Sequence, residues 1–407
     1  MKILVICDVP LVGFRPGMLV RSLGERGHEI TFLGPRLPAK MSLENRGYEK
    51  VKAVYIYGGH RWGDLHERGR QFVELSFKLN RLLKSEKFDL LRPMMLLADY
   101  LTIKCNQKYK SPILAGLTDI YSDIYRQVNL PLPGLAVPLI THMERVIMKN
   151  SDLLVVDTPV MRDLWKKWGL DEKKSVVLPF GEDYEMFRKG DCQKVKKKYE
   201  LTNEKIVLFH GGDITHLDGL DILIEATELL VKTIQEPFKV MIIGEGLENY
   251  MNFLKQLIKN KKLDKYFIFT GYIARYEDVP GYLACADVCV NPCSVNLTSY
   301  YNVPHKVIEY ILMNKPTVCT DVPGVKSMFS DAIYYIPPKS PKALYKAITQ
   351  ILNDDTLREK LIARTKEIAE YYRAEKIIAH EEKLMYLLVS KKVDDFRQFD
   401  WQLTYYK

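Results

Sequence analysis

Short apolar segments rich in β-branched residues alternate with longer segments of helical periodicity along almost the whole chain. In the first half, the apolar segments lie at residues 3–7, 28–33, 51–57, 88–91, 112–117, 153–157 and 176–179. A second series occupies residues 206–210, 240–243, 267–270, 288–292, 317–320 and 333–336. Buried parallel strands that alternate with helices produce this pattern. The chain therefore predicts an α/β protein with two Rossmann-like parallel sheets in tandem.

The segment between the two series of strands predicts a connection between domains. Residues 179–187 read Pro-Phe-Gly-Glu-Asp-Tyr-Glu-Met-Phe, and a polar, lysine-rich stretch follows as far as Glu200. Interdomain segments are typically polar and interrupted by Gly and Pro. We therefore expect a first domain at residues 1–180 and a second at residues 181–370, with a cleft where they meet.

Composition sets the protein class. The chain has 407 residues, of which 47% are hydrophobic, and this is enough for two cores without disulfides. Its seven cysteines are an odd number, which favours reduced thiols. No segment approaches the roughly 18 apolar residues of a membrane span, and residues 1–5 resemble a strand rather than a signal peptide, so we expect a cytoplasmic protein. A net charge of +9 without a basic, aromatic-rich run predicts no nucleic-acid binding.

One predicted helix, at residues 70–87, is both amphipathic and basic. Its apolar side comprises Phe72, Leu75, Leu79 and Leu82, and its cations are Arg70, Lys78, Arg81, Lys84 and Lys87. Such a helix can cover a sheet with its apolar side, which is the simpler interpretation. It can also lie on an anionic membrane, which would put the protein at the inner face of the membrane.

The most informative motif is Asn-Val-Pro-His-Lys-Val-Ile-Glu-Tyr at residues 302–310. Pro304 in a first turn predicts a helix start, whose backbone N–H groups and dipole favour a phosphate. Lys306 in the same turn would add a positive charge, while His305 is equally well explained as a surface imidazole. Glu309, on the same face, can accept hydrogen bonds from two ribose hydroxyls or pair with Lys306. The motif predicts a nucleotide site.

Motifs for other chemistries are missing from the sequence. The loop after the first strand has glycines only at Gly13 and Gly17, which disfavours a dinucleotide site. There is no Gly-x-Ser-x-Gly elbow, no Asp-x-Asp element at a strand end, and no histidine pair or acidic cluster with metal-ligand spacing. Cys285, Cys289 and Cys293 cannot share one helical face, because the helical pattern ends near residue 287. We expect neither a metal nor a cofactor.

Taken in order along the chain, several segments resemble the retaining glycosyltransferases of family 4. Five segments carry the resemblance. They are the opening helix and second strand (19–32), a later strand (151–156), the interdomain segment (180–187), the nucleobase segment (271–273 and 282–288) and the closing helices (371–388). The motif at residues 302–310 resembles the branch with Pro-x-Lys ahead of Glu-Tyr. The resemblance implies GT-B architecture, with two Rossmann-like domains facing across a cleft and residues 371–407 completing the first domain.

The resemblance also implies where the site residues lie. The implied donor residues are Gly212, Asp213, Gly244, Gly246, Tyr272, Ile273, Pro304, His305, Lys306, Val307 and Glu309. Lys306, Glu309 and Asp119 are the implied catalytic residues. Thr118 replaces the histidine of the family's His-Asp pair, and a strand-end aspartate that caps the next turn explains Asp119 as well. The loop expected to face the donor from the first domain contains Gly13, Arg15, Pro16 and Gly17.

Two departures from the family pattern bear on activity. The family pattern has two glutamates separated by seven residues. Glu309 matches the second, and Tyr301 replaces the first. Asp213 and Asp218 stand where the family usually has Arg and Lys. Two unit charges about 5 Å apart interact by roughly 3 kcal/mol at an effective dielectric near 20, so each reversal opposes a diphosphate. Either the aspartates point away from the phosphates, or the donor is unusual, or the site is silent.

The leading hypothesis is therefore transfer of a hexose-type sugar from a nucleotide diphosphate sugar to a glycan or lipid-linked acceptor, with retention. Peripheral membrane contact through residues 70–87 would accompany it. One alternative is a catalytically silent glycosyltransferase-like scaffold, motivated by Thr118, Asp213, Asp218 and Tyr301. The other is a sugar-nucleotide epimerase, since that activity also occurs on the GT-B fold.

Overall fold

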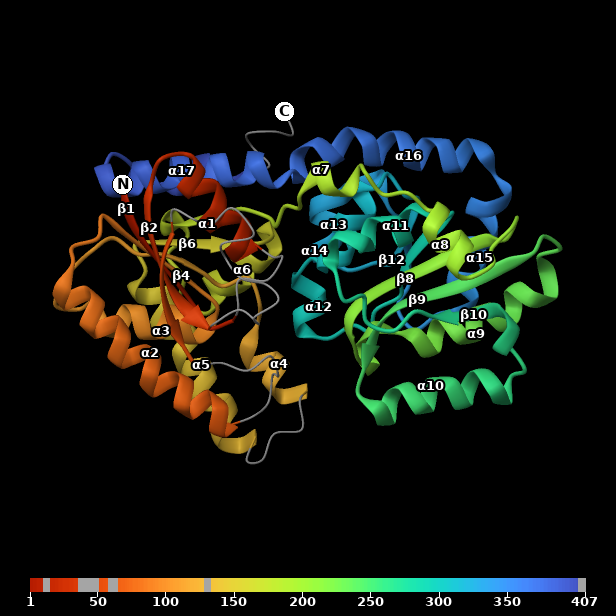
Figure 1. Ribbon diagram of the computed structural model, residues 1–407, viewed down its shortest axis with the longest axis horizontal. Helices are drawn as coiled ribbons and strands as arrows, with labels where there is room; N and C mark the ends of the chain where they lie inside the picture. The colour runs from red at the N-terminus through yellow and green to blue at the C-terminus, as the bar shows by residue number, and fades with distance from the viewer. Residues whose placement is uncertain (10–14, 36–50, 58–64, 128–132, 402–407) are drawn as a thin grey trace. The chain divides into compact units, whose positions relative to one another are not determined.

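A computed structural model describes residues 1–9, 15–35, 51–57, 65–127 and 133–401 of the chain. They form two compact units, one comprising Met1–Phe180 with Ala374–Lys407 and the other Gly181–Arg373 (Figure 1). Every strand pair between named strands of the described residues is parallel. The predicted α/β class with two Rossmann-like parallel sheets is confirmed.

The first unit is built on strands that run side by side in one direction. These are β1 (Lys2–Cys7), β2 (Glu29–Pro35), β3 (Val51–Ile56), β4 (Leu90–Met94), β5 (Leu114–Gly116), β6 (Leu153–Val156) and β7 (Ser175–Val177). Their order is β3-β2-β1-β4 and then β5-β6-β7, and a parallel bridge between Leu91 and Ile113 joins the two groups. The strands are largely apolar because helices cover both faces of such a sheet.

The helices of the first unit pack around this sheet (Figure 1). They are α1 (Arg15–Glu25), α2 (Leu65–Ser85), α3 (Leu96–Cys105), α4 (Tyr121–Gln127), α5 (Pro133–Asn150), α6 (Pro159–Lys167) and α17 (Ala374–Ser390). The start of α6 shows how the sequence fixes an element, since Thr158 precedes Pro159 and its hydroxyl accepts a hydrogen bond from Met161 N at 3.0 Å.

The buried side of helix α2 differs at one residue from the apolar side predicted from the sequence. Leu75, Leu79 and Leu82 are buried, so the helix does cover the unit with its apolar side. Phe72 was assigned to the same side, but it is 40% exposed. Gln71 is buried instead and donates a hydrogen bond to the backbone oxygen of Asp8 at 2.5 Å.

No helix among the described residues has the length and apolarity needed to cross a bilayer.

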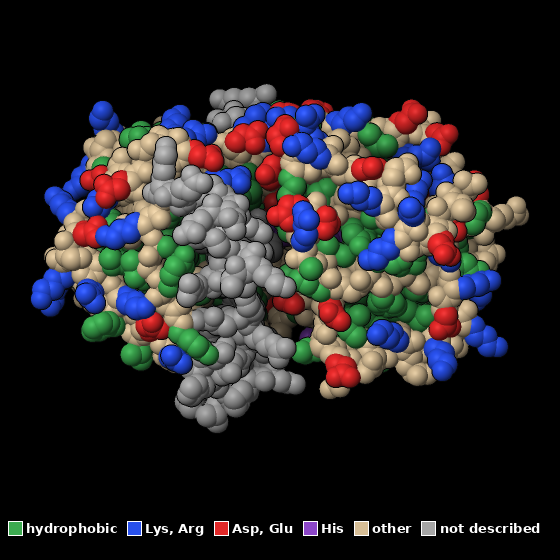
Figure 2. Space-filling view, in the orientation of Figure 1, with side chains coloured by type: hydrophobic (Ala, Val, Ile, Leu, Met, Phe, Trp, Pro, Cys, Tyr) green, Lys and Arg blue, Asp and Glu red, His purple; other side chains and the backbone are tan. Residues whose placement is uncertain are grey.

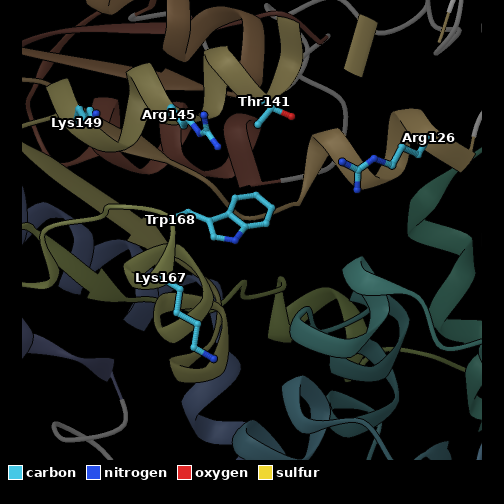
Figure 3. Close-up of a pocket in the computed structure, with 6 residues that line it drawn as sticks. All are labelled: Arg126, Thr141, Arg145, Lys149, Lys167 and Trp168. Atoms are coloured by element: carbon cyan, nitrogen blue, oxygen red, sulfur yellow. The ribbon is translucent and has the colours of Figure 1, made fainter. Parts of the chain in front are cut away.

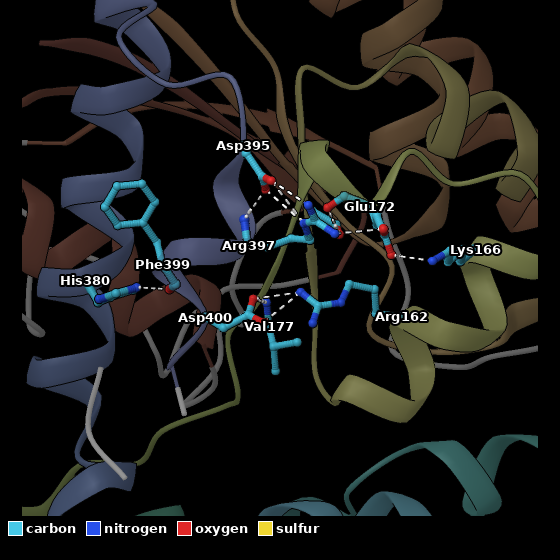
Figure 4. Close-up of polar contacts among 10 residues, drawn as sticks. Arg162, Lys166, Glu172, Val177, His380, Asp395, Arg397, Phe399 and Asp400 are labelled. Carbon is cyan, nitrogen blue, oxygen red and sulfur yellow. Dashed lines mark hydrogen bonds and ion pairs between the residues drawn. The ribbon is translucent and has the colours of Figure 1, made fainter. Parts of the chain in front are cut away.

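The C-terminal segment closes the first unit. Arg92 of β4 donates to Glu381 of α17 at 2.6 Å, and both side chains are almost completely buried. Further along, Asp400 accepts from Val177 N at 2.9 Å and pairs with Arg162 at 2.7 Å (Figure 4). These polar contacts tie the end of the described chain to β4, α6 and β7.

The second unit has a sheet of the same kind. Its strands are β8 (Lys205–Ile214), β9 (Phe238–Gly246), β10 (Phe267–Phe269), β11 (Val288–Asn291), β12 (Thr317–Thr320) and β13 (Tyr334–Ile336), in the order β10-β9-β8-β11-β12-β13. Its helices are α7 (Tyr184–Phe187), α8 (Gln193–Lys198), α9 (Leu220–Thr233), α10 (Glu248–Asn260), α11 (Val279–Ala284), α12 (Leu297–Tyr301), α13 (His305–Leu312), α14 (Pro323–Phe329), α15 (Pro341–Asn353) and α16 (Asp355–Ala369). The strand order reverses between β8 and β11, and open α/β sheets bind ligands at such a point.

Candidate functional site

The candidate site gathers where the strand order of the second unit reverses. Strand β8 supplies His210, the turn after β8 supplies Asp218, and helix α13 supplies His305, Lys306 and Glu309. These elements are separated by about ninety residues of sequence, yet side-chain contacts between them fix their relative positions. The motif at residues 302–310 therefore lies where a ligand of this fold class is expected.

Helix α13 begins one residue later than the sequence motif predicts. Pro304 is the residue that caps the helix, with φ −63° and ψ 132°, so it lies outside the first turn. Its carbonyl oxygen accepts from Val307 N at 3.0 Å, so the fixed φ of proline still sets the start of the helix. The Val307 side chain is fully buried, so only its backbone could face a ligand.

Glu309 is held on two sides by its neighbours. It is 3% exposed; the Tyr276 hydroxyl donates to Oε1 at 2.8 Å, and Nδ1 of His210 contacts Oε2. Tyr310 fixes the backbone beneath by accepting from His210 N at 2.7 Å. Burial works against ionisation, but the neighbouring His210 holds the pKa of Glu309 below its usual value. Glu309 is thus an oriented carboxylate, and its predicted alternative role as a partner of Lys306 was wrong.

An additional acid and base lie beside Glu309. Glu182 is completely buried, and its Oε1 lies 2.8 Å from His305 Nδ1. Burial raises the pKa of Glu182, and His305 opposes that rise. His305 is therefore more than the surface imidazole that the sequence also allowed.

Glu182, His305 and Glu309 form a group with metal-ligand spacing, because their ligand atoms lie within 4.8 Å of one another. The expectation that no such cluster exists was therefore wrong. However, Glu309 already contacts His210 and Tyr276, and Glu182 already contacts His305. The three side chains are thus already engaged with one another and with His210 and Tyr276.

Lys306 is engaged by one of the two aspartates that the sequence analysis singled out. Its Nζ lies 2.6 Å from Asp218 Oδ1 and 4.3 Å from the centre of the Phe209 ring. The other oxygen of Asp218 accepts from Thr215 N at 2.8 Å, so the carboxylate also caps the turn after β8. The structure therefore does not point Asp218 away from Lys306, and a phosphate would have to share Lys306 with this carboxylate.

Asp213 behaves differently from Asp218. It is exposed near the end of β8, opposite Glu245 of β9, and within the described chain it contacts no cation. It follows a register shift between His210 and Asp213 that carries Gly211 and Gly212. Only Asp218, therefore, restrains the cation of the donor motif directly.

The glycines at the ends of β8 and β9 allow two backbones to approach closely. Gly244 has φ +118°, and a Cβ there would lie 1.5 Å from Gly211 O. A Cβ on Gly246 would lie 2.1 Å from Ile214 O, whereas one on Gly212 would meet nothing within 4 Å. Gly244 and Gly246 are thus required by the fold, and Gly212 leaves open space beside the strand end.

Tyr272 and Ile273 lie in the loop after β10. Tyr272 is 65% exposed and Ile273 is half-buried. Gly271, the residue before them, accepts from Gly244 N at 3.1 Å, which ties this loop to the end of β9. The same loop continues to Tyr276, whose hydroxyl donates a hydrogen bond to Glu309. This contact links the loop to helix α13.

The residues expected from the first unit are described only in part. Asp119 lies half-buried between β5 and α4, and Pro16 and Gly17 are buried in α1. Gly13 and the side chain of Arg15 lie outside the described residues. Their expected position facing the donor remains a prediction.

Sequence reasoning missed several residues of both units. His210 could have been found, because a polar residue at the carboxyl end of an apolar strand is a usual signal. Tyr276 and Glu182 gave no local signal. In the first unit, Asp99 is completely buried and accepts from Gly116 N at 3.3 Å, and burial raises its pKa well above the usual value.

Comparison with known families gives two matches in succession. Residues 17–185 match the family model described as Glycosyltransferase Family 4. Residues 191–368 match the model described as Glycosyl transferases group 1. Together they cover most of both structural units.

Individual relatives are similar over different lengths. TuaC of Bacillus subtilis, named as a teichuronic acid biosynthesis glycosyltransferase, is 30% identical over 211 residues, which are 51% of this chain and 48% of that protein. The match thus spans about half the length of that relative. N-acetyl-alpha-D-glucosaminyl L-malate synthase of Bacillus anthracis is 20% identical over 381 residues, 90% of this chain and 91% of the relative.

The fold can be compared with a solved structure. Sucrose-phosphate synthase from Thermosynechococcus elongatus superposes with a TM-score of 0.79 over 96% of this chain and 100% of that chain. The two sequences are 15% identical, so this likeness concerns the fold alone.

Proposed function

Since this chain belongs to the family 4 glycosyltransferases and has the GT-B fold, we propose that it transfers a hexose-type sugar from a nucleotide diphosphate sugar to a glycan or lipid-linked acceptor, with retention at the anomeric carbon. The observation that carries the proposal is the Glu309 carboxylate, fixed by His210 and Tyr276 beside the start of α13. An ionised carboxylate has about four lone-pair directions, so it can still accept from the two hydroxyls of a ribose.

The start of α13 would hold the diphosphate. The first N–H groups of a helix and the positive end of its dipole favour a phosphate, and Lys306 lies within that first turn. As the glycosidic bond breaks, negative charge grows on the leaving diphosphate. Groups that stabilise this charge more strongly in the transition state than in the bound donor accelerate the reaction.

The proposal assigns the chain to the branch of family 4 that has Pro-x-Lys ahead of Glu-Tyr. It needs neither a metal nor a cofactor. Lys306 and the helix start would supply the positive charge that a divalent ion supplies in other transferases. Activity should therefore survive a metal chelator. Loss of activity on chelation that added Mg²⁺ or Mn²⁺ restores would contradict this part of the proposal.

Two substitutions test the donor site. Lys306→Ala should lower turnover more than donor affinity, because the leaving charge is greatest in the transition state. Glu309→Ala should chiefly weaken nucleotide binding, because the ribose contact is made equally before and during reaction. Steady-state kinetics and calorimetric titration measure the two effects. Lys326→Ala, which removes an exposed helix lysine paired with Asp321, is the control. Unchanged kinetics in both site variants would contradict the assignment.

The pair formed by Lys306 and Asp218 favours one rival function, a catalytically silent scaffold. If the phosphates cannot displace Asp218, the fold would persist without donor binding. Thermal denaturation with a panel of nucleoside diphosphates and their sugars distinguishes the two. A donor at one hundred times its dissociation constant should stabilise the protein by roughly 2.7 kcal/mol, whereas a scaffold would show no response. Conversion of a donor sugar without acceptor would instead indicate an epimerase.

Helix α2 supports a further part of the proposal, peripheral contact with the cytoplasmic face of a membrane. Its exposed apolar side chains include Val73 and Phe77, which are 67% and 68% exposed, and Arg70 stacks on the Tyr57 ring at 3.9 Å. Figure 2 shows hydrophobic side chains between Lys and Arg side chains over this helix. Such a surface suits the headgroup region of an anionic bilayer.

Vesicle binding tests the membrane contact. The double variant Val73→Ser/Phe77→Ser should lose co-sedimentation with phosphatidylglycerol vesicles. Leu247→Ser, which changes a side chain that is 80% exposed in the second unit, should keep it. Equal binding by the two variants would rule out α2 as the contact surface.

A further inference from the structure

A hollow lies on the surface of the first unit, outside the candidate site. It has a volume of about 430 Å³ and is lined by Arg126, Thr141, Arg145, Lys149, Lys167 and Trp168. These residues come from α4, from one face of α5 and from the end of α6. The lining includes neither Asp119 nor the start of α1. The pocket is therefore separate from the strand ends where the first unit is expected to face the donor.

The cations of this pocket are not held in ion pairs by the described residues around them. No ion pair in the described part of the chain involves Arg126, Arg145, Lys149 or Lys167. By contrast, two other cations of α6 are paired: Arg162 with Asp400 and Lys166, next to Lys167, with Glu172, each at 2.7 Å. Unpaired cations that gather around one hollow create a positive potential that attracts an anion.

The described lining contains no carboxylate to cancel that potential. Glu144, the residue before Arg145 on α5, is completely buried and accepts from Ser122 N at 3.0 Å. Burial raises the pKa of Glu144, while the hydrogen bond from the backbone of Ser122 and the Arg126 charge oppose this rise. An anionic ligand would find donors without displacing an internal partner.

Trp168 gives the pocket a flat apolar wall in a fixed orientation. Its ring packs edge-on against Trp165, with ring centres 5.0 Å apart and an interplanar angle of 74°. Trp165 is fully buried, and its Nε1 donates to Leu117 O at 3.3 Å. Trp168 therefore packs against a fully buried residue of the core. A half-buried, oriented indole that lines a pocket is suited to packing against the C–H face of a sugar ring.

The charges surround this wall. Figure 3 shows Arg126 and Arg145 extending toward the indole from α4 and α5, while Lys167 extends away from it. On α5, Thr141, Arg145 and Lys149 follow one another at intervals of four residues and share one face. Guanidinium groups bind carboxylate and phosphate with two parallel hydrogen bonds, and the threonine hydroxyl can serve a sugar hydroxyl.

We propose that this pocket binds a sugar residue that carries an anionic group, a carboxylate or a phosphate, in the glycan acceptor. The proposal rests on the proposed function for the role of that sugar as acceptor, and it names the acceptor as an acidic glycan. A hollow of this volume matches the size of small-ligand sites, which favours a discrete sugar over a flat membrane surface. The pocket holds the acceptor glycan away from the reacting end and so sets which glycans are elongated.

Direct binding tests the proposal on the full chain. The probes are tetragalacturonate, glucose 6-phosphate, neutral maltotetraose, inorganic phosphate and phosphatidylglycerol vesicles, each titrated at low and at high salt. The pocket variants are Arg145→Gln/Lys149→Gln and Trp168→Ala. The control is Lys255→Gln/Lys259→Gln, which removes the same charge, at the same spacing of four residues, from an exposed face of α10 in the second unit.

Tetragalacturonate or glucose 6-phosphate should bind the wild type, and the affinity should fall as the salt concentration rises. Maltotetraose should not bind. Each pocket variant should lower the affinity at least about tenfold, because it removes a charge-assisted pair or the stacking wall, and the control should not. Which acidic sugar binds distinguishes a uronate from a phosphorylated unit. Thermal stabilisation by nucleoside diphosphates, measured in the same variants, should stay unchanged, so this proposal can fail while the donor site stands.

Three results would overturn the proposal. Equal losses in the pocket and control variants would indicate general charge attraction. Binding of inorganic phosphate that Trp168→Ala leaves unchanged, with no binding of either acidic sugar, would indicate a bare anion site. Vesicle binding that only the pocket variants abolish, without binding of an acidic sugar, would indicate a membrane surface.

Discussion

At the scale of single residues, the contact between Lys306 and Asp218 decides how a diphosphate can bind. Asp218→Asn keeps an oxygen that can accept from Thr215 N, so the cap of the turn is retained, but it removes the charge that competes for Lys306. The affinity for the nucleoside diphosphate that stabilises the wild type should therefore rise roughly tenfold, or by about 1.4 kcal/mol. Isothermal titration measures this change.

Asp213→Asn is the matched control for that prediction. It removes the same charge near the same strand end, but Asp213 does not contact Lys306. Its effect should be smaller, because exposed charges are screened by water and salt. A larger effect at Asp213 than at Asp218 would mean that the diphosphate lies along the end of β8 rather than against Lys306.

The pair formed by Glu182 and His305 predicts a dependence of stability on pH. Burial raises the pKa of Glu182 above 4.5, so the folded protein binds this proton more tightly than the unfolded chain does. The corresponding stabilisation is present below the unfolded pKa and is lost as the pH rises through the folded pKa. His305→Gln removes the group that opposes the raised pKa of Glu182. The stability lost as the pH rises should therefore be larger in this variant than in the wild type.

Urea unfolding at about pH 5 and about pH 7 measures this effect. The free energy of unfolding should fall more steeply with rising pH in His305→Gln than in the double variant Glu182→Gln/His305→Gln, which has no carboxyl group to titrate. Parallel pH profiles for the two variants would show that Glu182 does not titrate in this range.

Site residues could be predicted where their signal is local. Lys306 and Glu309 stand in one motif around a proline, so their common helix follows from adjacent residues. Glu182 reaches Glu309 only through the fold, and Tyr276 does so from the loop after β10. Contacts between residues far apart in sequence have no periodic or turn signal of their own, and the sequence analysis therefore missed them.

At the scale of elements, each strand from β1 to β13 overlaps one apolar segment of the predicted series. Parallel strands buried on both faces give continuous apolar runs, which are the strongest signal of this fold class. The errors are of another kind. Phe72 is exposed because Gln71 faces inward, and α13 starts after Pro304 because a proline can cap a helix from outside its first turn.

Gly244 and Gly212 allow a test of how closely β8 and β9 must approach. Gly244→Ala should destabilise the second unit by several kcal/mol or prevent folding, because the added carbon would lie 1.5 Å from Gly211 O at a φ of +118°. Gly212→Ala should change the free energy of unfolding by less than about 1 kcal/mol, since nothing lies near its added carbon. Denaturant unfolding of the two variants provides the comparison, and similar losses would contradict this account.

At the scale of the whole molecule, the ion pair of Arg92 and Glu381 joins the C-terminal helix to the first sheet. Both side chains are almost fully buried, and the oxygen–nitrogen distance is 2.6 Å. Glu381→Gln leaves the Arg92 charge without its counterion and should cost roughly 3–5 kcal/mol of stability.

Arg92→Met/Glu381→Met provides the control for this prediction. Replacing both charges with apolar side chains leaves no buried charge unpaired, so the double variant should be more stable than Glu381→Gln. Urea unfolding monitored by circular dichroism measures both. A double variant as unstable as the single one would mean that packing, rather than charge, explains the loss.

The second unit is inserted within the first. Its two ends meet where Glu182 N donates to Tyr372 O at 3.0 Å, and α17 then returns to β4. A chain made from its N-terminus can therefore complete residues 181–373 while the first sheet still lacks α17 and the contacts of Glu381. The order of maturation on the ribosome would be the reverse of the usual one, with the later unit finished first. Until α17 emerges, Arg92 lacks the Glu381 carboxylate that is its counterion in the completed first unit.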